Sequence, residues 1–335
     1  IFKNKETETS ELSEAEKNKF QIEADDLLKK GSLGEAAASY DEAMGHYNQA
    51  YQIYQRIRAS KGLANSLLLI AIVFQNQGNY EHALLKLKDA LNISEKNNFF
   101  SLKADIYVVL GAIYSLEFNH KKALESYQKA FNINKKLENR LLETQILGGI
   151  GHVYLLLAQF SEAQKYFQKS LKMALEIEDK RMEARSLGYI GIVCQKLGQY
   201  DESIKYYKKS IKMTQCTKDK RNEGQTLGNL ATVYKKNGEY DEALICFQKS
   251  LKIAREVGNK RNEGHNLGNV GEVYFQQNRL AEAKEVLIQA IDILESISPP
   301  ESGIFLGVLA FLYTIEGNLE KAFAALEKGE PEKGE

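Results

Sequence analysis

The stretch "KRNEGQTLGNLATVYKKNGEYDEALICFQKS", Lys220 to Ser250, holds two amphipathic patterns separated by the short polar break "KNGE". In each pattern, apolar residues recur at positions i, i+3, i+4 and i+7, which is the spacing of one face of an α-helix. The break combines glycine with polar residues, a composition that favours a turn. The stretch therefore predicts a helical hairpin, that is, two antiparallel helices joined by a short turn.

This hairpin pattern repeats every 40 residues. The segment "KRNEGQTLGN" at Lys220 returns as "KRNEGHNLGN" at Lys260 with two positions changed. A fixed period of this length is typical of proteins in which each repeat stacks on its neighbours. The sequence therefore predicts an all-α array of hairpins. Its aligned columns include Tyr80, Tyr200 and Tyr240; Ala83, Ala123, Ala163 and Ala243; and Leu91, Leu171 and Leu251.

The spacing inside each repeat resembles that of a known family. A small residue is followed at fixed offsets by aromatic residues and alanine, as in Ala231, Tyr234, Tyr240, Ala243 and Phe247. This matches the Leu-Gly, Tyr, Ala and Phe pattern of the tetratricopeptide family. The resemblance covers nearly the whole chain and implies a right-handed α-solenoid, a superhelix of about eight helical hairpins.

The repeat is longer than the 34 residues most common in that family. It is similar to a 40-residue subclass that includes the spindle-orientation adaptors named for Leu-Gly-Asn and bacterial signalling proteins. That subclass carries asparagine directly after the small residue of the first helix. This chain has no asparagine there, so we expect no asparagine ladder; the position holds Ile72, Ala112, His152, Ile192, Thr232, Glu272 and Phe311.

We expect a single array between residues 17 and 328, with a polar segment before it at 1–16 and a polar tail after it at 329–335. The chain begins without Met and ends just after a helical pattern, so we also expect a fragment of a longer protein. The expected repeats span approximately 17–60, 61–100, 101–140, 141–180, 181–220, 221–260, 261–298 and 299–328.

Composition argues against several classes of partner. Lys+Arg and Asp+Glu both number 45, and a zero formal charge disfavours general binding to nucleic acid or to an anionic membrane. The start of the chain lacks the apolar region of a signal peptide, and the longest apolar runs are too short for a membrane span. The three cysteines form no CxxC pair, which predicts a reduced, cytoplasmic protein.

Motifs for catalysis or metal binding are not found in the sequence. The five histidines show no HExxH motif or paired metal spacing, and there is no nucleophile elbow and no Walker loop. Cys194 stands at an aromatic position of the repeat, which favours a small core residue over a nucleophile. We therefore predict no enzyme activity, no catalytic residues, no cofactor and no metal.

The resemblance implies that the first helices line a concave groove that binds extended peptides or partner helices. One column of these helices is mostly polar, which a buried structural position would not favour, and amide side chains can both donate to and accept from a peptide backbone. A protein or peptide ligand is therefore the expected partner. The expected groove residues are Gln145, His152, Arg185, Gln195, Gln225, Asn229, Lys235, His265, Asn269 and Glu272.

Two further features of the groove leave alternatives open. Its amino-terminal third is apolar, and Leu68 and Val108 either anchor a hydrophobic ligand residue or pack between first helices. Glycines recur inside the first helices, where each destabilises a helix by roughly 0.5–1 kcal/mol relative to alanine. The column Gly148, Gly188, Gly228 and Gly268 either lets first helices approach or opens space for a ligand, whereas Gly111, Gly151, Gly191 and Gly271 allow the two helices of a repeat to cross.

The start of the first helices carries a second recurring pattern. Asn139, Asp179, Asp219 and Asn259 stand where a side-chain oxygen can cap the helix. A Lys-Arg pair follows the cap in three repeats, with glutamate two residues after the pair's arginine. The pair either forms a basic ridge for an acidic partner or makes ion pairs within its repeat, worth a few tenths of a kcal/mol.

We consider three functions, of which the first two fit these observations. The first is a non-catalytic scaffold that binds a peptide or partner helix. The second is the regulatory or sensor part of a larger protease, kinase or transcription regulator whose effector domain is absent from this sequence. The third, a nucleic-acid-binding array, is disfavoured by the neutral charge and by the lack of aromatic residues on a basic face.

Overall fold

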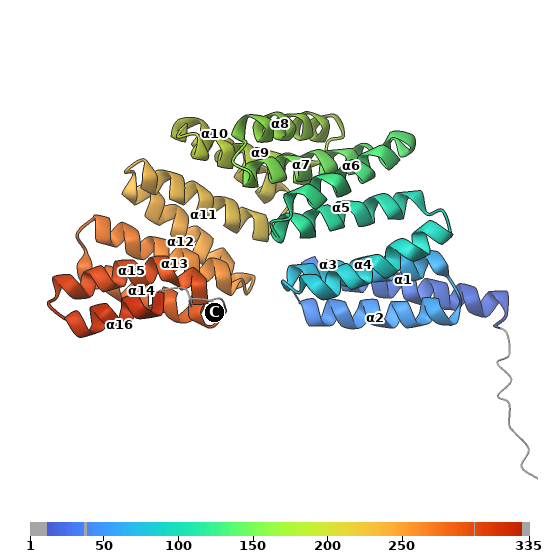
Figure 1. Cartoon of the computed structure of the whole chain (residues 1–335), viewed down its shortest axis with the longest axis horizontal. Helices are drawn as coiled ribbons and strands as arrows, with labels where there is room; N and C mark the ends of the chain where they lie inside the picture. The colour runs from blue at the N-terminus through green and yellow to red at the C-terminus, as the bar shows by residue number, and fades with distance from the viewer. Residues whose placement is uncertain (1–11, 37–38, 298, 330–335) are drawn as a thin grey trace, which may run out of the picture. The chain divides into compact units, whose positions relative to one another are not determined.

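The computed structural model describes residues 12–36, 39–297 and 299–329. These residues form sixteen α-helices and no strand, and the helices follow one another along the chain as eight pairs (Figure 1). The predicted all-α fold of consecutive hairpins is confirmed. Most of the expected polar segment 1–16 and almost all of the expected tail 329–335 lie outside the described residues.

In each pair the first helix carries an odd number and the second an even number. Almost all the helices from α2 onward are 16 to 18 residues long, and α16 is the shorter exception. Their bounds are α1 Glu14–Ala36, α2 Tyr40–Arg56, α3 Ser60–Asn76, α4 Tyr80–Lys96, α5 Phe100–Leu116, α6 His120–Leu137, α7 Arg140–Leu156, α8 Phe160–Glu176, α9 Lys180–Lys196, α10 Tyr200–Cys216, α11 Lys220–Lys236, α12 Tyr240–Glu256, α13 Lys260–Gln276, α14 Leu280–Glu295, α15 Pro299–Ile315 and α16 Leu319–Gly329.

The predicted caps start the first helices. The side chain of Asp179 accepts from the backbone N–H groups of Arg181 and Met182, and Asp219 accepts from Asn222. Asn139 and Asn259 make the equivalent bond. These side chains satisfy donors that the first turn of a helix leaves without a backbone partner.

The described chain divides into two compact units, with the boundary in the sequence between Val153 and Tyr154. In the N-terminal unit, the second helices bury residues such as Leu87 and Tyr127 against the first helices of the same and the following repeat. In the C-terminal unit, Tyr207 and Phe247 take the same place and are fully buried. Each unit therefore has its own succession of apolar cores.

Small residues allow the helices of a repeat to cross closely, as predicted. A Cβ atom at Gly111 would lie 2.8 Å from the ring of Tyr127, and one at Gly191 would lie 2.8 Å from the ring of Tyr207. Real Cβ atoms do not approach other atoms so closely. Glycine in this column is therefore a packing requirement of the hairpin.

The other glycine column packs successive repeats together at two of its positions. A Cβ atom at Gly228 would lie 3.0 Å from Oδ1 of Asn266 on the next first helix, and one at Gly268 would clash with the ring of Phe305 on α15. At Gly188 the nearest contact would be an ordinary 3.5 Å, to Ser210. The packing alternative therefore holds at Gly228 and Gly268, and these glycines do not open a groove.

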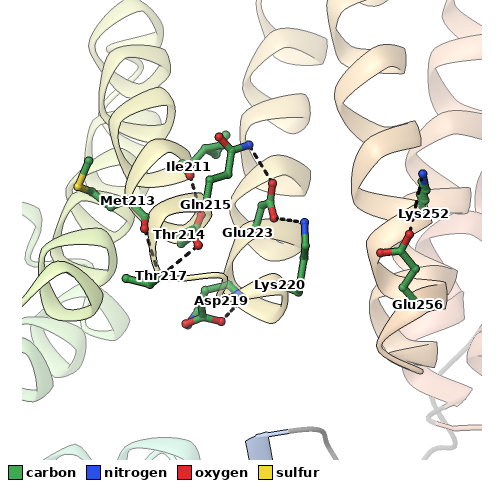
Figure 2. Close-up of polar contacts among 11 residues, drawn as sticks. Ile211, Met213, Thr214, Gln215, Thr217, Asp219, Lys220, Glu223, Lys252 and Glu256 are labelled. Carbon is green, nitrogen blue, oxygen red and sulfur yellow. Dashed lines mark hydrogen bonds and ion pairs between the residues drawn. The ribbon is translucent and has the colours of Figure 1, made fainter.

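The repeated "KRNEG" segment joins neighbouring repeats. Glu223 is buried and accepts hydrogen bonds from Nζ of Lys220 at 2.8 Å and from Nε2 of Gln215 on the preceding helix α10 at 2.9 Å (Figure 2). One repeat later, Glu263 binds Lys260 and Arg255 in the same way, both at 2.8 Å. The lysine of the Lys-Arg pair thus forms an ion pair inside its own repeat, while the glutamate also ties that repeat to the one before it.

These hydrogen bonds control the ionisation of the buried glutamate. Burial alone would raise the pKa of Glu263, but the hydrogen bonds and charges of Lys260 and Arg255 outweigh burial and lower the pKa. Glu263 therefore stays ionised at neutral pH. The glycine that follows has a separate role, because a Cβ atom at Gly264 would lie 2.7 Å from Leu294 on α14.

Candidate ligand-binding face of the first helices

One surface column of the first helices carries polar side chains in six successive repeats. Its residues alternate with buried neighbours, so that Asp105, for example, lies between the buried Ala104 and Ile106. We call this column the polar row, and the helix face that carries it the row face. The polar row consists of Asn65, Asp105, Gln145, Arg185, Gln225 and His265.

Helix geometry brings other predicted residues to the row face. Residues four and seven positions after a member of the row lie on the same side of an α-helix, and a residue ten positions after it lies at the edge of that side, about 80° away. His152, Asn229, Lys235, Asn269 and Glu272 occupy such positions and are half-buried. Consecutive first helices also contact each other, as in α3 with α5, α9 with α11, α11 with α13, and α13 with α15.

In the N-terminal unit, the row holds the half-buried side chains of Asn65, Asp105 and Gln145. Asp105 is the charged member, and burial raises the pKa of its carboxyl group to about 6. Leu68, one turn after Asn65, is 6% exposed and belongs to the apolar core. The packing alternative therefore applies to Leu68, and Val108 is a half-buried residue packed against the next core.

The C-terminal unit contains the other members of the row. Arg185 and Gln225 are exposed, and the guanidinium carbon of Arg185 lies 5.8 Å from the centre of the Tyr189 ring. Gln195 serves its own repeat, because its Oε1 accepts a hydrogen bond of 3.3 Å from the hydroxyl group of the buried Tyr207. Arg185 and Gln225 are therefore more accessible to a ligand than Gln195.

Three predicted residues form one cluster between α11 and α13. Nζ of Lys235 donates to Oδ1 of Asn269 at 2.7 Å and also forms an ion pair with Glu272. Nδ2 of Asn269 donates to the backbone carbonyl of His265 at 2.8 Å. The side chains of Lys235 and Glu272 are only 16% and 24% exposed. This cluster joins two first helices, so a ligand would meet a neutral, internally bonded surface here.

His265 belongs to a second cluster, which reaches α15 and includes a residue that the sequence analysis missed. Nε2 of His265 and Nε of Arg261 each lie 2.8 Å from Oε2 of Glu301. The hydrogen bond from Arg261, with the help of His265, holds the pKa of Glu301 at about 2 although burial opposes this. Glu301 lies 40 residues after Arg261, so opposite charges one repeat apart were the signal that could have found it.

Apolar side chains of the first helices differ in exposure between the two ends of the described chain. The amino-terminal third was expected to be the apolar part, yet Leu68 is buried there. On α15, at the far end of the described chain, Ile304 and Phe311 are 72% and 55% exposed. Phe311 also makes an edge contact with Phe275, the rings being 5.7 Å apart. Leu68 is therefore unavailable as a hydrophobic anchor, and exposed apolar side chains also occur on α15.

The described residues give little support for other chemistry. Among them, no three His, Cys, Asp or Glu side chains come together in a way that could hold a metal ion. The search for a membrane span, which covered the same residues, found no helix of sufficient length and apolar character. Cys194 is 2% exposed, and burial raises the pKa of its thiol, as expected for a core residue.

Comparison with solved structures identifies similar folds. A signal transduction ATPase with numerous domains (STAND) and a tetratricopeptide repeat sensor, from Pyrococcus horikoshii, is 21% identical with a TM-score of 0.64. The match covers 95% of this chain but only 52% of that protein. Aspartyl phosphate phosphatase F from Bacillus subtilis is 16% identical over 96% of this chain and 94% of its own, with a TM-score of 0.61.

A third structure, a Rap protein complexed with competence and sporulation factor, is 16% identical, with a TM-score of 0.59. It is matched over its whole length and over 94% of this chain. Identities this low show a shared fold and nothing more. The comparison with curated proteins found no match.

The family comparison is more direct. The tetratricopeptide repeat model matches residues 27–96, 102–176, 142–215 and 222–296, which together make up well over half of the chain. The matched segments agree with the helix pairs, the small-residue crossings and the buried aromatic columns described above. This chain belongs to the tetratricopeptide repeat family.

Proposed function

We propose that this protein is a non-catalytic interaction scaffold that binds a peptide or a partner helix on the row face of its first helices. One observation carries the proposal. Six successive first helices have a polar side chain in the same column, none of these side chains is buried, and the residues on either side of each one are buried. Helix packing requires the buried neighbours, but it does not require a polar side chain at each position of the row.

The chemistry of the row suits a peptide ligand. Glutamine and asparagine side chains both donate and accept, as the backbone of an extended peptide does. The residues proposed to contact the ligand are those of the predicted groove, of which Arg185 and Gln225 are the exposed members in the C-terminal unit. The three free cysteines agree with the expected reduced, cytoplasmic setting.

The family and the structural neighbours support an interaction or sensor role. One neighbour is described as complexed with competence and sporulation factor, and another as carrying a tetratricopeptide repeat sensor. Protein or peptide partners are therefore proposed ahead of nucleic acid, which the zero formal charge disfavours.

A peptide selection tests the proposal. A phage-displayed library of 12-residue peptides is selected on the immobilised chain, and the affinities of selected peptides are measured by calorimetry. The triple variant Gln145→Ala, Arg185→Ala, Gln225→Ala should weaken binding at least tenfold. The matched control Gln128→Ala, Gln168→Ala, Gln248→Ala alters exposed glutamines of the second helices and should leave affinity within twofold. If the triple row variant binds the peptides as tightly as the control variant does, the row face is rejected as the binding site.

The match to the STAND protein favours a second function. It covers about half of that protein, which is described as having a sensor of this fold. The chain would then be the sensor part of a larger signalling protein with a protease, kinase, ATPase or regulator domain. The mass of the native protein, measured by immunoblotting with an antibody against this chain, separates the two: a mass close to 37.9 kDa rejects the larger protein.

A further inference from the structure

The polar row of the N-terminal unit contains one charged side chain, and that charge is not compensated. Within the part of the chain that the structure describes, the half-buried carboxylate of Asp105 has neither a hydrogen-bond donor nor a cation as partner. The pKa of this group is raised by burial, and no neighbouring charge contributes to the shift. The nearest basic residue in the sequence, Lys103, pairs instead with Glu95 at 2.8 Å.

Three other buried or half-buried carboxylates have cationic partners. Glu223 binds Lys220, Glu263 binds Lys260 and Arg255, and Glu301 binds Arg261. A partly desolvated carboxylate without a partner is less favourable than a paired one, so a cationic group of a ligand at Asp105 would stabilise it.

The repeat itself shows that the fold does not require an acid at this position. The same column holds asparagine at 65 and glutamine at 145 and 225, all neutral amides. Asparagine would fill almost the same space as Asp105 without the unfavourable charge. The fold therefore explains a polar side chain at this position of α5, but it does not explain the negative charge of Asp105.

The surroundings define what could bind there. Asn65 on α3 and Gln145 on α7 hold the equivalent positions one repeat to either side, and both are half-buried amides for which the described residues provide no hydrogen bond. Val108 and Val109, one turn after Asp105, are half-buried apolar side chains. The face thus combines one carboxylate, amide oxygens and an apolar surface.

We propose that the row face of the N-terminal unit binds a peptide through an arginine side chain, whose guanidinium group pairs with the Asp105 carboxylate. The proposal rests on the proposed function and specifies its ligand. The planar guanidinium can donate two parallel hydrogen bonds to a carboxylate. Its remaining N–H groups would need further acceptors, for which the amide oxygens of Asn65 and Gln145 stand at the equivalent positions of the neighbouring first helices. Its methylene groups would suit the apolar Val108 and Val109.

Arginine fits this site better than lysine. A guanidinium group is more weakly hydrated than an ammonium group, and it loses less on entering a half-buried site. Its several donors also match the several oxygen acceptors of the face. The residues on either side of the arginine in the ligand should be apolar, to match the valines of α5.

The test uses the peptides selected on the full chain. Binding to wild type is compared with binding to Asp105→Asn and to the control Asp89→Asn, which neutralises an exposed carboxylate on α4. Each peptide is also made with citrulline in place of arginine, which keeps the shape and removes the charge. Asp105→Asn and the citrulline change should each weaken binding about 10- to 100-fold, while Asp89→Asn changes it less than twofold.

A double-mutant cycle checks that the two groups contact each other. If they do, the citrulline peptide should bind wild type and Asp105→Asn with nearly equal affinity. Thermal melts of Asp105→Asn, followed by circular dichroism, verify that the variant is folded.

Two results would reject the arginine site, and only the second would also reject the peptide-binding function. Selected peptides that bind Asp105→Asn and wild type equally would reject this site alone, provided that the triple row variant still loses binding. Failure to select any peptide would reject both the arginine site and the peptide-binding function.

Discussion

Asp105→Asn should stabilise the protein at neutral pH, although it removes a charged side chain from the candidate binding face. Burial raises the pKa of Asp105 from 3.8 to about 6. A difference of about 2 in pKa corresponds to about 3 kcal/mol in the free energy of unfolding. Asp105 is only half-buried and solvent screens its charge, so we expect about 1–2 kcal/mol.

The sign of this stability change follows from how tightly the folded and the unfolded chain bind the Asp105 proton. The folded protein binds the Asp105 proton more tightly than the unfolded chain, so protonation stabilises the fold below the unfolded pKa of about 4. This stabilisation is lost as pH rises through about 6. Asparagine stays neutral throughout, so the variant should gain about 1–2 kcal/mol over wild type at pH 8 and only a few tenths at pH 4.

Urea unfolding at pH 4, 6 and 8, followed by circular dichroism, measures this difference, and hydrogen exchange of α5 shows whether the gain is local. The control Asp89→Asn, on an exposed surface, should change stability by less than about 0.5 kcal/mol at each pH. A variant that is less stable than wild type at pH 8, or a gain in stability that does not depend on pH, would refute the conclusion that the Asp105 carboxylate is uncompensated in the folded protein.

Three further predictions concern stability. Tyr234→Ala should destabilise adjacent repeats by about 3–5 kcal/mol, because it empties a buried site, and hydrogen exchange should speed up in α11 and α12 but not in α5. Glu263→Gln should lose about 1–3 kcal/mol at pH 7 in urea unfolding and much less below pH 4, because the lowered pKa of Glu263 stabilises the fold only while the carboxylate is ionised. Phe118→Gly should gain about 1 kcal/mol in thermal unfolding, because the exposed Phe118 has a φ of 57° that glycine adopts more easily.

The fold could be predicted because its determinants are local and periodic. The caps Asp179 and Asp219 and the small residues Gly111 and Gly191 act within one repeat, so their 40-residue spacing is visible in the sequence. Even here, the role of Gly228 needed the structure, because the side chain that fills its space belongs to Asn266 on the next first helix.

The candidate site was less predictable, because its properties depend on contacts between repeats. Lys235, Asn269 and Glu272 were predicted as separate groove residues, but they bind one another. Glu301 was missed because its partners Arg261 and His265 come from the preceding repeat. Asp105 belongs to the polar row, but the sequence could not show that its carboxylate is half-buried and has no partner among the described residues.

A crystal structure of the chain with a selected arginine-containing peptide would show directly whether the ligand lies on the row face. We predict electron density for the peptide on the row face of the first helices, with its guanidinium group within 3 Å of the Asp105 carboxylate, about the length of a charge-assisted hydrogen bond. A peptide bound to the second helices, with the polar row left open to solvent, would contradict binding at the row face.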